Sequence, residues 1–161
     1  MDSTGHWKDA GARFKCASRL SNNKMGVSFG GRKSKGSVAE RDLIHKFWGE
    51  GWGAVRVAGS GSSQFPSPDL LVGNKLRKLA LEVKAINADR KYFPKEEIEA
   101  LQYFSEKYGA EPWVAIKFDR DQFYFVNPED LKETKKSFVA TVDLCKSKGL
   151  LLQEIIKSDF L

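Results

Sequence analysis

Histidine and cysteine are scarce in this chain, whose 161 residues include only two of each and no CxxC spacing. His6, His45, Cys16 and Cys145 are too few and too scattered to predict a structural zinc site. Long apolar runs are also absent, so neither a membrane-spanning helix nor a secretion signal is expected. Length and composition instead favour one globular domain in a reducing cytoplasm.

Positive charge is concentrated at the N-terminal end of the sequence. Residues 1–36 contain eight Lys or Arg and two Asp or Glu, whereas residues 37–161 contain 19 of each, so the net charge of +6 belongs to the first segment. That segment is rich in Gly, Ser and Asn and shows no sustained periodicity. We therefore expect residues 1–34 to be a basic, disordered extension, either a solvated tail or a nucleic-acid-binding arm, and residues 35–161 to form one domain.

The body of the chain alternates between helical and strand patterns. Ser37 and Glu40 form a capping-box pattern that predicts where the first helix begins, while Pro94 and Gly109 bound a second helix. The order of the elements, with a hairpin at its centre, indicates an α/β fold in which helices flank a mixed sheet. The expected elements are a helix over 37–50, strands over 54–58, 69–72 and 79–84, a helix over 94–109, strands over 113–118 and 123–126, and a small α/β region from 128 onward that ends in a helix near 150–156. The apolar face of the first helix is expected to consist of Leu43, Ile44, Phe47 and Trp48.

Three charged residues interrupt the apolar pattern of the predicted hairpin, namely Asp69, Glu82 and Lys84. If the hairpin is symmetric about the gap between Lys75 and Leu76, Asp69 lies opposite Glu82, and Lys84 lies on the same face. Two facing carboxylates repel unless a cation lies near them, and oxygen ligands favour Mg²⁺ or Mn²⁺. The pattern predicts a metal-dependent hydrolytic site; the alternative is a structural Glu82–Lys84 ion pair with Asp69 capping a turn.

Glu40 is a candidate fourth member of this site, because it falls on the line of the first helix that turns inward. A glutamate at the third position of a capping box is equally well explained by local hydrogen bonding. Arg41 and Arg56 are similarly open, since isolated arginines are most often surface residues. Spacing alone therefore leaves the roles of these three residues undecided.

The residues Pro68-Asp69 and Glu82-Val83-Lys84 resemble the PD-(D/E)xK nuclease motif. Four longer segments occur in the order and at the distances that resemble the archaeal Holliday junction resolvases: KGSVAERDLI (35–44), AVRVAGSG (54–61), FPSPDLLVGN (65–74) and LALEVK (79–84). The resemblance spans about residues 33–135 and does not extend to residues 1–32. It implies a restriction-endonuclease-like fold in a symmetric homodimer, which cuts four-way DNA junctions by paired nicks in recombination and repair, in an archaeal-type cell.

The resemblance also implies roles for individual residues. Asp69, Glu82 and the Val83 carbonyl would hold Mg²⁺, for which Mn²⁺ would substitute; Glu40 would bind it directly or through water, and Lys84 would be the catalytic lysine. Ser60 lies in a loop that contributes a catalytic or phosphate-contacting serine in some members. Arg41 and Arg56 match DNA-contacting arginines, and further candidates for phosphate contact are Lys33, Lys35, Arg90 and Lys91. Phe104 and Tyr108 match aromatic residues of the family's dimer interface.

Two other functions remain open at this point. A nuclease of the same superfamily can cut linear duplex DNA instead of a junction. An architectural DNA-binding protein can carry the same charge cluster as a purely structural feature. Metal-dependent cleavage separates the architectural protein from the nucleases, and a requirement for branched DNA separates the two nucleases.

Overall fold

The computed structural model describes residues 30–58, 64–119 and 121–158, with side chains from residue 37 onward. Its helices are α2 (Gly30–Gly49), α3 (Lys95–Tyr108), α4 (Val142–Lys148) and α5 (Leu152–Lys157), with a short 3-10 turn η4 (Pro128–Asp130). A five-stranded sheet has the order β1 (Gly53–Arg56), β2 (Leu70–Gly73), β3 (Lys78–Ile86), β5 (Glu111–Phe118) and β6 (Phe123–Val126). A second, three-stranded sheet has the order β4 (Arg90–Pro94), β8 (Ser137–Thr141) and β7 (Lys132–Glu133).

The larger sheet is mixed, as predicted. Strands β3 and β5 run parallel, and the other neighbours in this sheet are antiparallel. In the hairpin of β2 and β3, Leu70 pairs with Leu81 and Gly73 pairs with Lys78, which confirms the register that places Asp69 opposite Glu82. A parallel pair needs a crossover connection, and β4 with α3 supplies it between β3 and β5.

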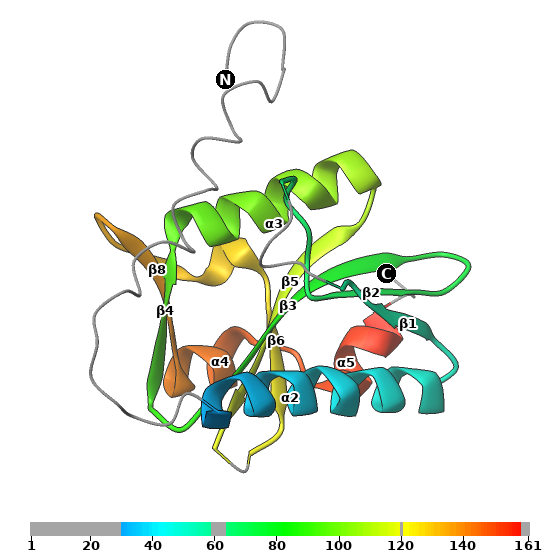
Figure 1. The fold of residues 1–161 in the computed structure, drawn as a ribbon, viewed down its shortest axis with the longest axis horizontal. Helices are drawn as coiled ribbons and strands as arrows, with labels where there is room; N and C mark the ends of the chain where they lie inside the picture. The colour runs from blue at the N-terminus through cyan, green and yellow to red at the C-terminus, as the bar shows by residue number, and fades with distance from the viewer. Residues whose placement is uncertain (1–29, 59–63, 120, 159–161) are drawn as a thin grey trace, which may run out of the picture.

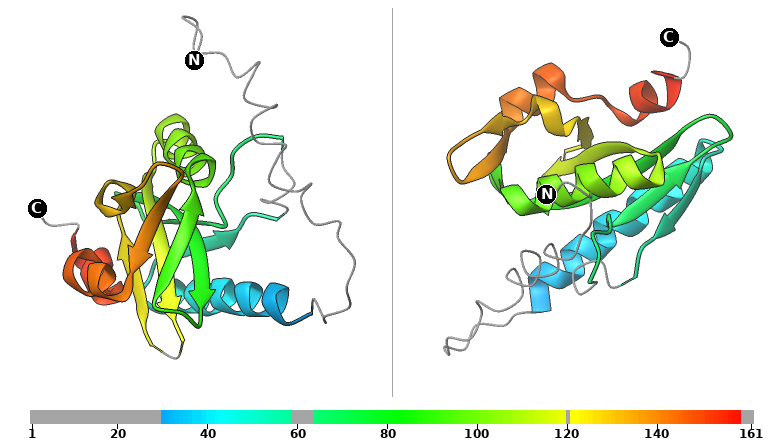
Figure 2. Two further views of the ribbon diagram at one scale, coloured as in Figure 1. Left: turned by 90° about the vertical axis from the view of Figure 1, so that its left-hand side faces the viewer. Right: turned by 90° about the horizontal axis from the view of Figure 1, so that it is seen from above.

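Helices α2 and α3 cover opposite faces of this sheet (Figures 1 and 2). The alternation of β3 separates two apolar cores, because successive strand residues point to opposite faces. Leu79, Leu81 and Val83 belong to the core beneath α2, whereas Ala80 belongs to the core beneath α3. The same alternation assigns Glu82 and Lys84 to the α3 face, so the charged residues and α3 share one side of the sheet.

Helix α2 differs from the expectation at its start and in one residue of its apolar face, whereas its end at Gly49 agrees with the expected end near Glu50. It begins at Gly30, so the predicted start at Ser37 is wrong, and the predicted domain boundary after residue 34 falls inside this helix. The glycines of its first turns have low helix propensity, which is why this stretch reads as irregular. Trp48 was assigned to the apolar face, but its side chain is 61% exposed and its Nε1 donates to the Ala54 carbonyl at 2.9 Å.

The second sheet was not predicted from the sequence. Strand β4 pairs with β8, with Tyr92 opposite Val139 and Phe93 opposite Phe138. Phe93 is fully buried, so β4 is part of the core beneath α3. The predicted C-terminal α/β region is present, and its last helix is α5. No helix within the described ranges is long and apolar enough to cross a membrane.

Candidate functional site

The Asp69 carboxylate lies against the backbone of β3. The Asp69 backbone N–H donates to the Leu81 carbonyl at 3.0 Å, and the Val83 N–H donates to Asp69 Oδ2 at 2.9 Å. These two bonds hold Asp69 beside the segment Glu82-Val83-Lys84. The local cause is the hairpin turn, where Asn74 Oδ1 accepts from two backbone N–H groups and fixes the register.

Lys84 lies between two carboxylates rather than one. Its Nζ is 2.6 Å from Glu82 Oε1 and 2.7 Å from Glu97 Oε1. We call Glu82, Lys84 and Glu97 the lysine cluster. Their side chains are 13%, 25% and 27% exposed, so the cluster is largely shielded from solvent but still accessible to it. Glu82 and Lys84 come from β3, whereas Glu97 comes from the first turn of α3.

The electrostatics of this cluster favour a protonated Lys84 and disfavour a charged Glu82 carboxylate. Burial raises the pKa of Glu82 well above its usual range; Lys84 opposes this effect, while Asp69 and Glu97 add to it. Burial by itself lowers the pKa of Lys84, but Glu82 and Glu97 outweigh it, so the net pKa is higher than usual. Burial likewise raises the pKa of Glu97, but Lys84 and a hydrogen bond with Glu82 outweigh it and lower this pKa. Lys84 is therefore an ammonium, suited to binding anionic oxygens rather than to removing a proton.

The cluster supplies the type of donor atom that a hard divalent cation prefers. Asp69, Glu82 and Glu97 with Lys84 amount to three carboxylates and one ammonium, which leaves two negative charges for a cation to balance. Carboxylate and carbonyl oxygens are the ligands that Mg²⁺ and Mn²⁺ prefer. Within the described ranges, no group of three or more His, Cys, Asp or Glu side chains is placed to hold a metal. Asp69, Glu82 and the Val83 carbonyl therefore stay a prediction for the metal ligands, and so does the binding of Glu40 directly or through water.

Glu40, on helix α2, is connected to Asp69 through residues 56 and 57. Its carboxylate accepts from Arg56 Nε, and its side chain is only 12% exposed. Arg56 pairs with Leu70 across β1 and β2, and the next residue, Val57, donates its N–H to the Asp69 carbonyl at 2.9 Å. Glu40 is thus linked to the site through β1 rather than by direct contact with the lysine cluster.

The remaining candidates, apart from Ser60, lie on α2 and β4. Arg41 is exposed, and its Nε donates to the Ser37 carbonyl at 3.1 Å. Arg90 is exposed on β4; Lys91 is half-buried, with Nζ 5.6 Å from the centre of the Phe93 ring, and it adds to Lys84 in lowering the pKa of Glu97. Lys33 and Lys35 lie on the part of α2 where only the backbone is described, and Ser60 lies outside the described residues.

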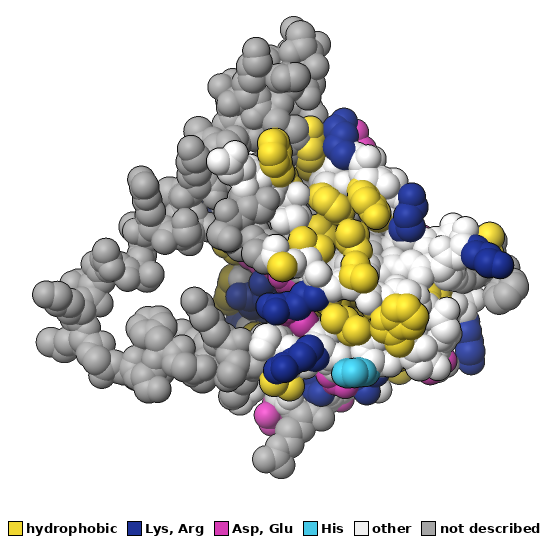
Figure 3. Space-filling model, turned by 45° about the vertical axis from the view of Figure 1, so that its right-hand side comes forward, with side chains coloured by type: hydrophobic (Ala, Val, Ile, Leu, Met, Phe, Trp, Pro, Cys, Tyr) yellow, Lys and Arg dark blue, Asp and Glu magenta, His cyan; other side chains and the backbone are white. Residues whose placement is uncertain are grey.

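An apolar surface adjoins α3. Tyr108 is 49% exposed and stacks on Phe104, with ring centroids 5.3 Å apart. A groove of about 220 Å³ connects Tyr108 to Trp48 and Val55, which are 61% and 57% exposed. A space-filling view shows apolar side chains gathered on one face of the molecule (Figure 3). We call Trp48, Val55, Phe104 and Tyr108 the aromatic face.

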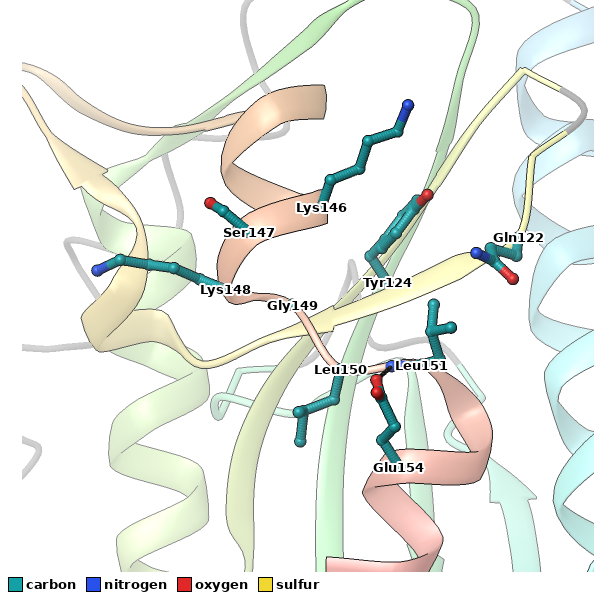
Figure 4. A pocket seen from close by; sticks show the side chains of 9 residues that line it. All are labelled: Gln122, Tyr124, Lys146, Ser147, Lys148, Gly149, Leu150, Leu151 and Glu154. Atoms are coloured by element: carbon teal, nitrogen blue, oxygen red, sulfur yellow. Dashed lines mark hydrogen bonds between the residues drawn. The ribbon is translucent and has the colours of Figure 1, made fainter.

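A larger hollow, of about 460 Å³, lies between β6, α4 and α5 (Figure 4). Lys148 Nζ already binds Asp130 at 3.0 Å, and Glu154 accepts from the Leu151 N–H at 2.6 Å. In Figure 4 the side chains of Lys146 and Lys148 extend away from one another instead of converging. This hollow therefore offers no set of converging charges, and we place the candidate site at the lysine cluster.

Glu97 is the member of the cluster that sequence reasoning missed. An acid in the first turn of a helix is normally explained by the helix dipole, so Glu97 drew no attention. The expected crossover helix between two parallel strands could have predicted this contact. A helix that connects β3 to β5 must cover one face of β3, and its first turn then lies near the charged residues of that face.

Comparison with known proteins identifies the family. The family model described as archaeal Holliday junction resolvase (Hjc) matches residues 31–160. The chain belongs to this resolvase family. The match begins within one residue of the start of α2, so this helix is part of the family domain.

Resolvases from two archaea illustrate the similarity. The crossover junction endodeoxyribonuclease Hjc of Archaeoglobus fulgidus is 43% identical over 106 residues, which cover 66% of this chain and 78% of that protein. The Hjc of Methanocaldococcus jannaschii is 38% identical over 105 residues, covering 65% and 74%. A crystal structure of Archaeoglobus fulgidus Hjc, a Holliday junction resolvase, superposes with a TM-score of 0.71 at 38% identity and covers 74% of this chain and 98% of that chain.

Proposed function

We propose that this chain is a metal-dependent endonuclease that cuts four-way DNA junctions. The observation that carries the proposal is the half-buried cluster of Asp69, Glu82 and Lys84, in a chain that belongs to the resolvase family. Its relatives are named crossover junction endodeoxyribonucleases, which supports the same substrate and reaction here. The products would be 5′-phosphate and 3′-hydroxyl ends.

The mechanism assigns a separate task to each residue. Asp69, Glu82 and the Val83 carbonyl would hold Mg²⁺ or Mn²⁺, which would polarise the scissile phosphate as a Lewis acid and lower the pKa of the attacking water. Lys84 donates hydrogen bonds to phosphate oxygens as negative charge develops on them. Glu40, which accepts from Arg56, would bind the metal directly or through water.

We infer that two copies assemble through the aromatic face. Large exposed apolar patches on soluble proteins mark interaction sites, and this one includes both residues predicted for the dimer interface. A symmetric dimer presents two active sites to one junction, which accounts for paired nicks. Phosphate contacts from Arg41, Arg56 and the basic residues of α2 and β4 would then select branched DNA by its shape.

Cleavage of labelled DNA tests this function. Wild type and Glu82→Ala are incubated with a four-way junction or with linear duplex of the same sequence, in Mg²⁺ or in chelator. We expect paired nicks in the junction alone, and a loss of about 100-fold or more with chelator or in Glu82→Ala. Junction binding by Glu82→Ala should be retained or tightened, because the variant removes an acidic repulsion.

The matched control is Glu99→Ala, which removes the same charge from an exposed position on α3 and should cut normally. Equal cutting of junction and duplex would replace the proposal with a duplex endonuclease. Tight binding without any cutting would replace it with an architectural protein.

A further inference from the structure

The position of Lys84 depends on two carboxylates that come from different elements. Glu82 lies two residues before Lys84 on β3, whereas Glu97 lies across the connection through β4, in the first turn of α3. The Lys84 Nζ atom lies 2.6 Å from the Glu82 carboxylate and 2.7 Å from the Glu97 carboxylate, so both are direct partners. The proposed mechanism uses Glu82 and Lys84 but assigns no task to Glu97.

Glu82 cannot serve Lys84 and a cation equally well. A carboxylate that ligates a divalent ion gives up electron density and one or both oxygens to it, so its bond to the lysine weakens. Lys84 would then move unless another acceptor holds it. Glu97 is that acceptor, because it is carried by α3 rather than by the strand that carries Glu82 and Lys84.

We propose that Glu97 is a positioning residue, which keeps the Lys84 ammonium beside the scissile phosphate while Glu82 serves the metal. This inference rests on the proposed nuclease function. Helix α3 is suited to the task because Ile98, directly after Glu97, is fully buried, and Leu101 one turn later is 3% exposed. A side chain on such an anchored helix holds its partner more precisely than one on a loop.

A simpler explanation is that Glu97 only stabilises the N-terminus of α3. Glu96 provides the matched control, because it occupies the same first turn but is exposed, and the structure gives its carboxyl no ion pair among the described residues. The charge of either residue interacts with the helix dipole. If the dipole explained Glu97, then Glu97→Gln and Glu96→Gln would behave alike.

The activity test separates binding from cutting. We expect Glu97→Gln to lower the single-turnover cleavage rate of the preformed junction complex by about 10-fold to 100-fold, because a misplaced catalytic group loses rate steeply. The junction Kd, measured in Ca²⁺ without cutting, should change by less than about 2-fold. Glu96→Gln should match the wild type in both, and Glu97→Asp, which keeps the charge, should recover part of the rate.

A second readout does not depend on cleavage. In metal-free protein, the ¹⁵Nζ–H signal of Lys84 should be sharp in the wild type and in Glu96→Gln, because two hydrogen bonds slow proton exchange. In Glu97→Gln the signal should broaden or disappear at an unchanged melting temperature. An unchanged Lys84 signal, or equal losses in binding and cutting, would overturn the positioning role. A wild type with the expected Lys84 behaviour but no cleavage would overturn the proposed function and with it the catalytic purpose of the contact, while the finding that Glu97 holds Lys84 would stand.

Discussion

At the scale of single residues, the Glu82 carboxylate is the group most affected by its surroundings. It lies 13% exposed near Asp69 and Glu97, with Lys84 as its cation. Burial raises the pKa of Glu82, which means that the folded protein binds this proton more tightly than the unfolded chain does. The same environment that destabilises the metal-free charged form is what makes the position favourable for a divalent cation.

The pH dependence of stability follows from that shift. Without divalent ions, the contribution of Glu82 is fully present below the ordinary glutamate pKa and is lost as pH rises through the raised pKa. We expect Glu82→Gln to flatten this decline and to be more stable than wild type at neutral pH, by an amount on the order of 1 kcal/mol. Urea unfolding in chelator across a pH series measures both effects.

The lowered pKa of Glu97 acts in a different pH range. Its contribution is present above the ordinary glutamate pKa and is lost as pH falls below it, so it does not obscure the decline assigned to Glu82. Glu99→Gln is the control, since that residue is exposed on the same helix. Parallel pH profiles for wild type and Glu82→Gln would contradict the assignment.

At the scale of elements, one arginine fastens the C-terminal helix to the sheet. Arg77 pairs with Glu111 through two bonds, of 2.7 Å and 2.6 Å, which link the hairpin end to the start of β5. Its Nη1 donates to the Ile155 carbonyl at 2.9 Å and to Ser158 Oγ at 2.7 Å. Its side chain is 15% exposed and lies 5.9 Å from the Trp52 ring centroid, so these bonds are largely shielded from water.

Replacing this arginine should loosen α5. We expect Arg77→Ala to lower the free energy of unfolding by about 2 kcal/mol, because a charge-assisted bidentate pair and two further bonds are lost. Hydrogen exchange should accelerate in α5 more than in α2. Lys75→Ala, at an exposed position in the same turn, should change stability by less than about 0.5 kcal/mol. Equal effects of the two substitutions would show that Arg77 does not fasten the helix.

At the scale of the whole molecule, the aromatic face stands at an edge of the five-stranded sheet. Strand β1 is the edge strand, and Val55 on it is 57% exposed. Trp48 is fixed against β1 by its bond to the Ala54 carbonyl, so this ring offers a preformed surface. Rigid aromatic groups of this kind lose little conformational entropy when they are covered.

A charged substitution on this face should separate the proposed dimer. We expect Tyr108→Glu to weaken self-association by about 10-fold or more, because it places a carboxylate in an apolar interface. Sedimentation velocity should then show a monomer where the wild type is a dimer, and cutting should produce single rather than paired nicks. The control is Tyr92→Glu, which changes an exposed tyrosine on β4, outside the aromatic face. It should leave the dimer mass in sedimentation unchanged. A monomeric wild type would contradict the assembly itself.

The sequence by itself determined the hairpin and the charged residues that it brings together. Asp69, Glu82 and Lys84 meet because a short turn and a two-residue period fix their register and face, and both are local properties. The same is true of Gly109, which ends α3 with a positive φ of 69° that favours glycine. Motif spacing around this hairpin was sufficient to indicate the resolvase family.

Only the tertiary structure decided the rest of the site and of the fold. Glu97 joins Lys84 because α3 packs on the face of β3 that carries the charges, and no local pattern encodes that contact. Strand β4 depends on its pairing with β8, far along the chain, and the start of α2 at Gly30 overrides the low helix propensity of its glycines. The physical reason is common to all three: the free energy comes from burial and pairing between segments distant in sequence, which neither period nor spacing records.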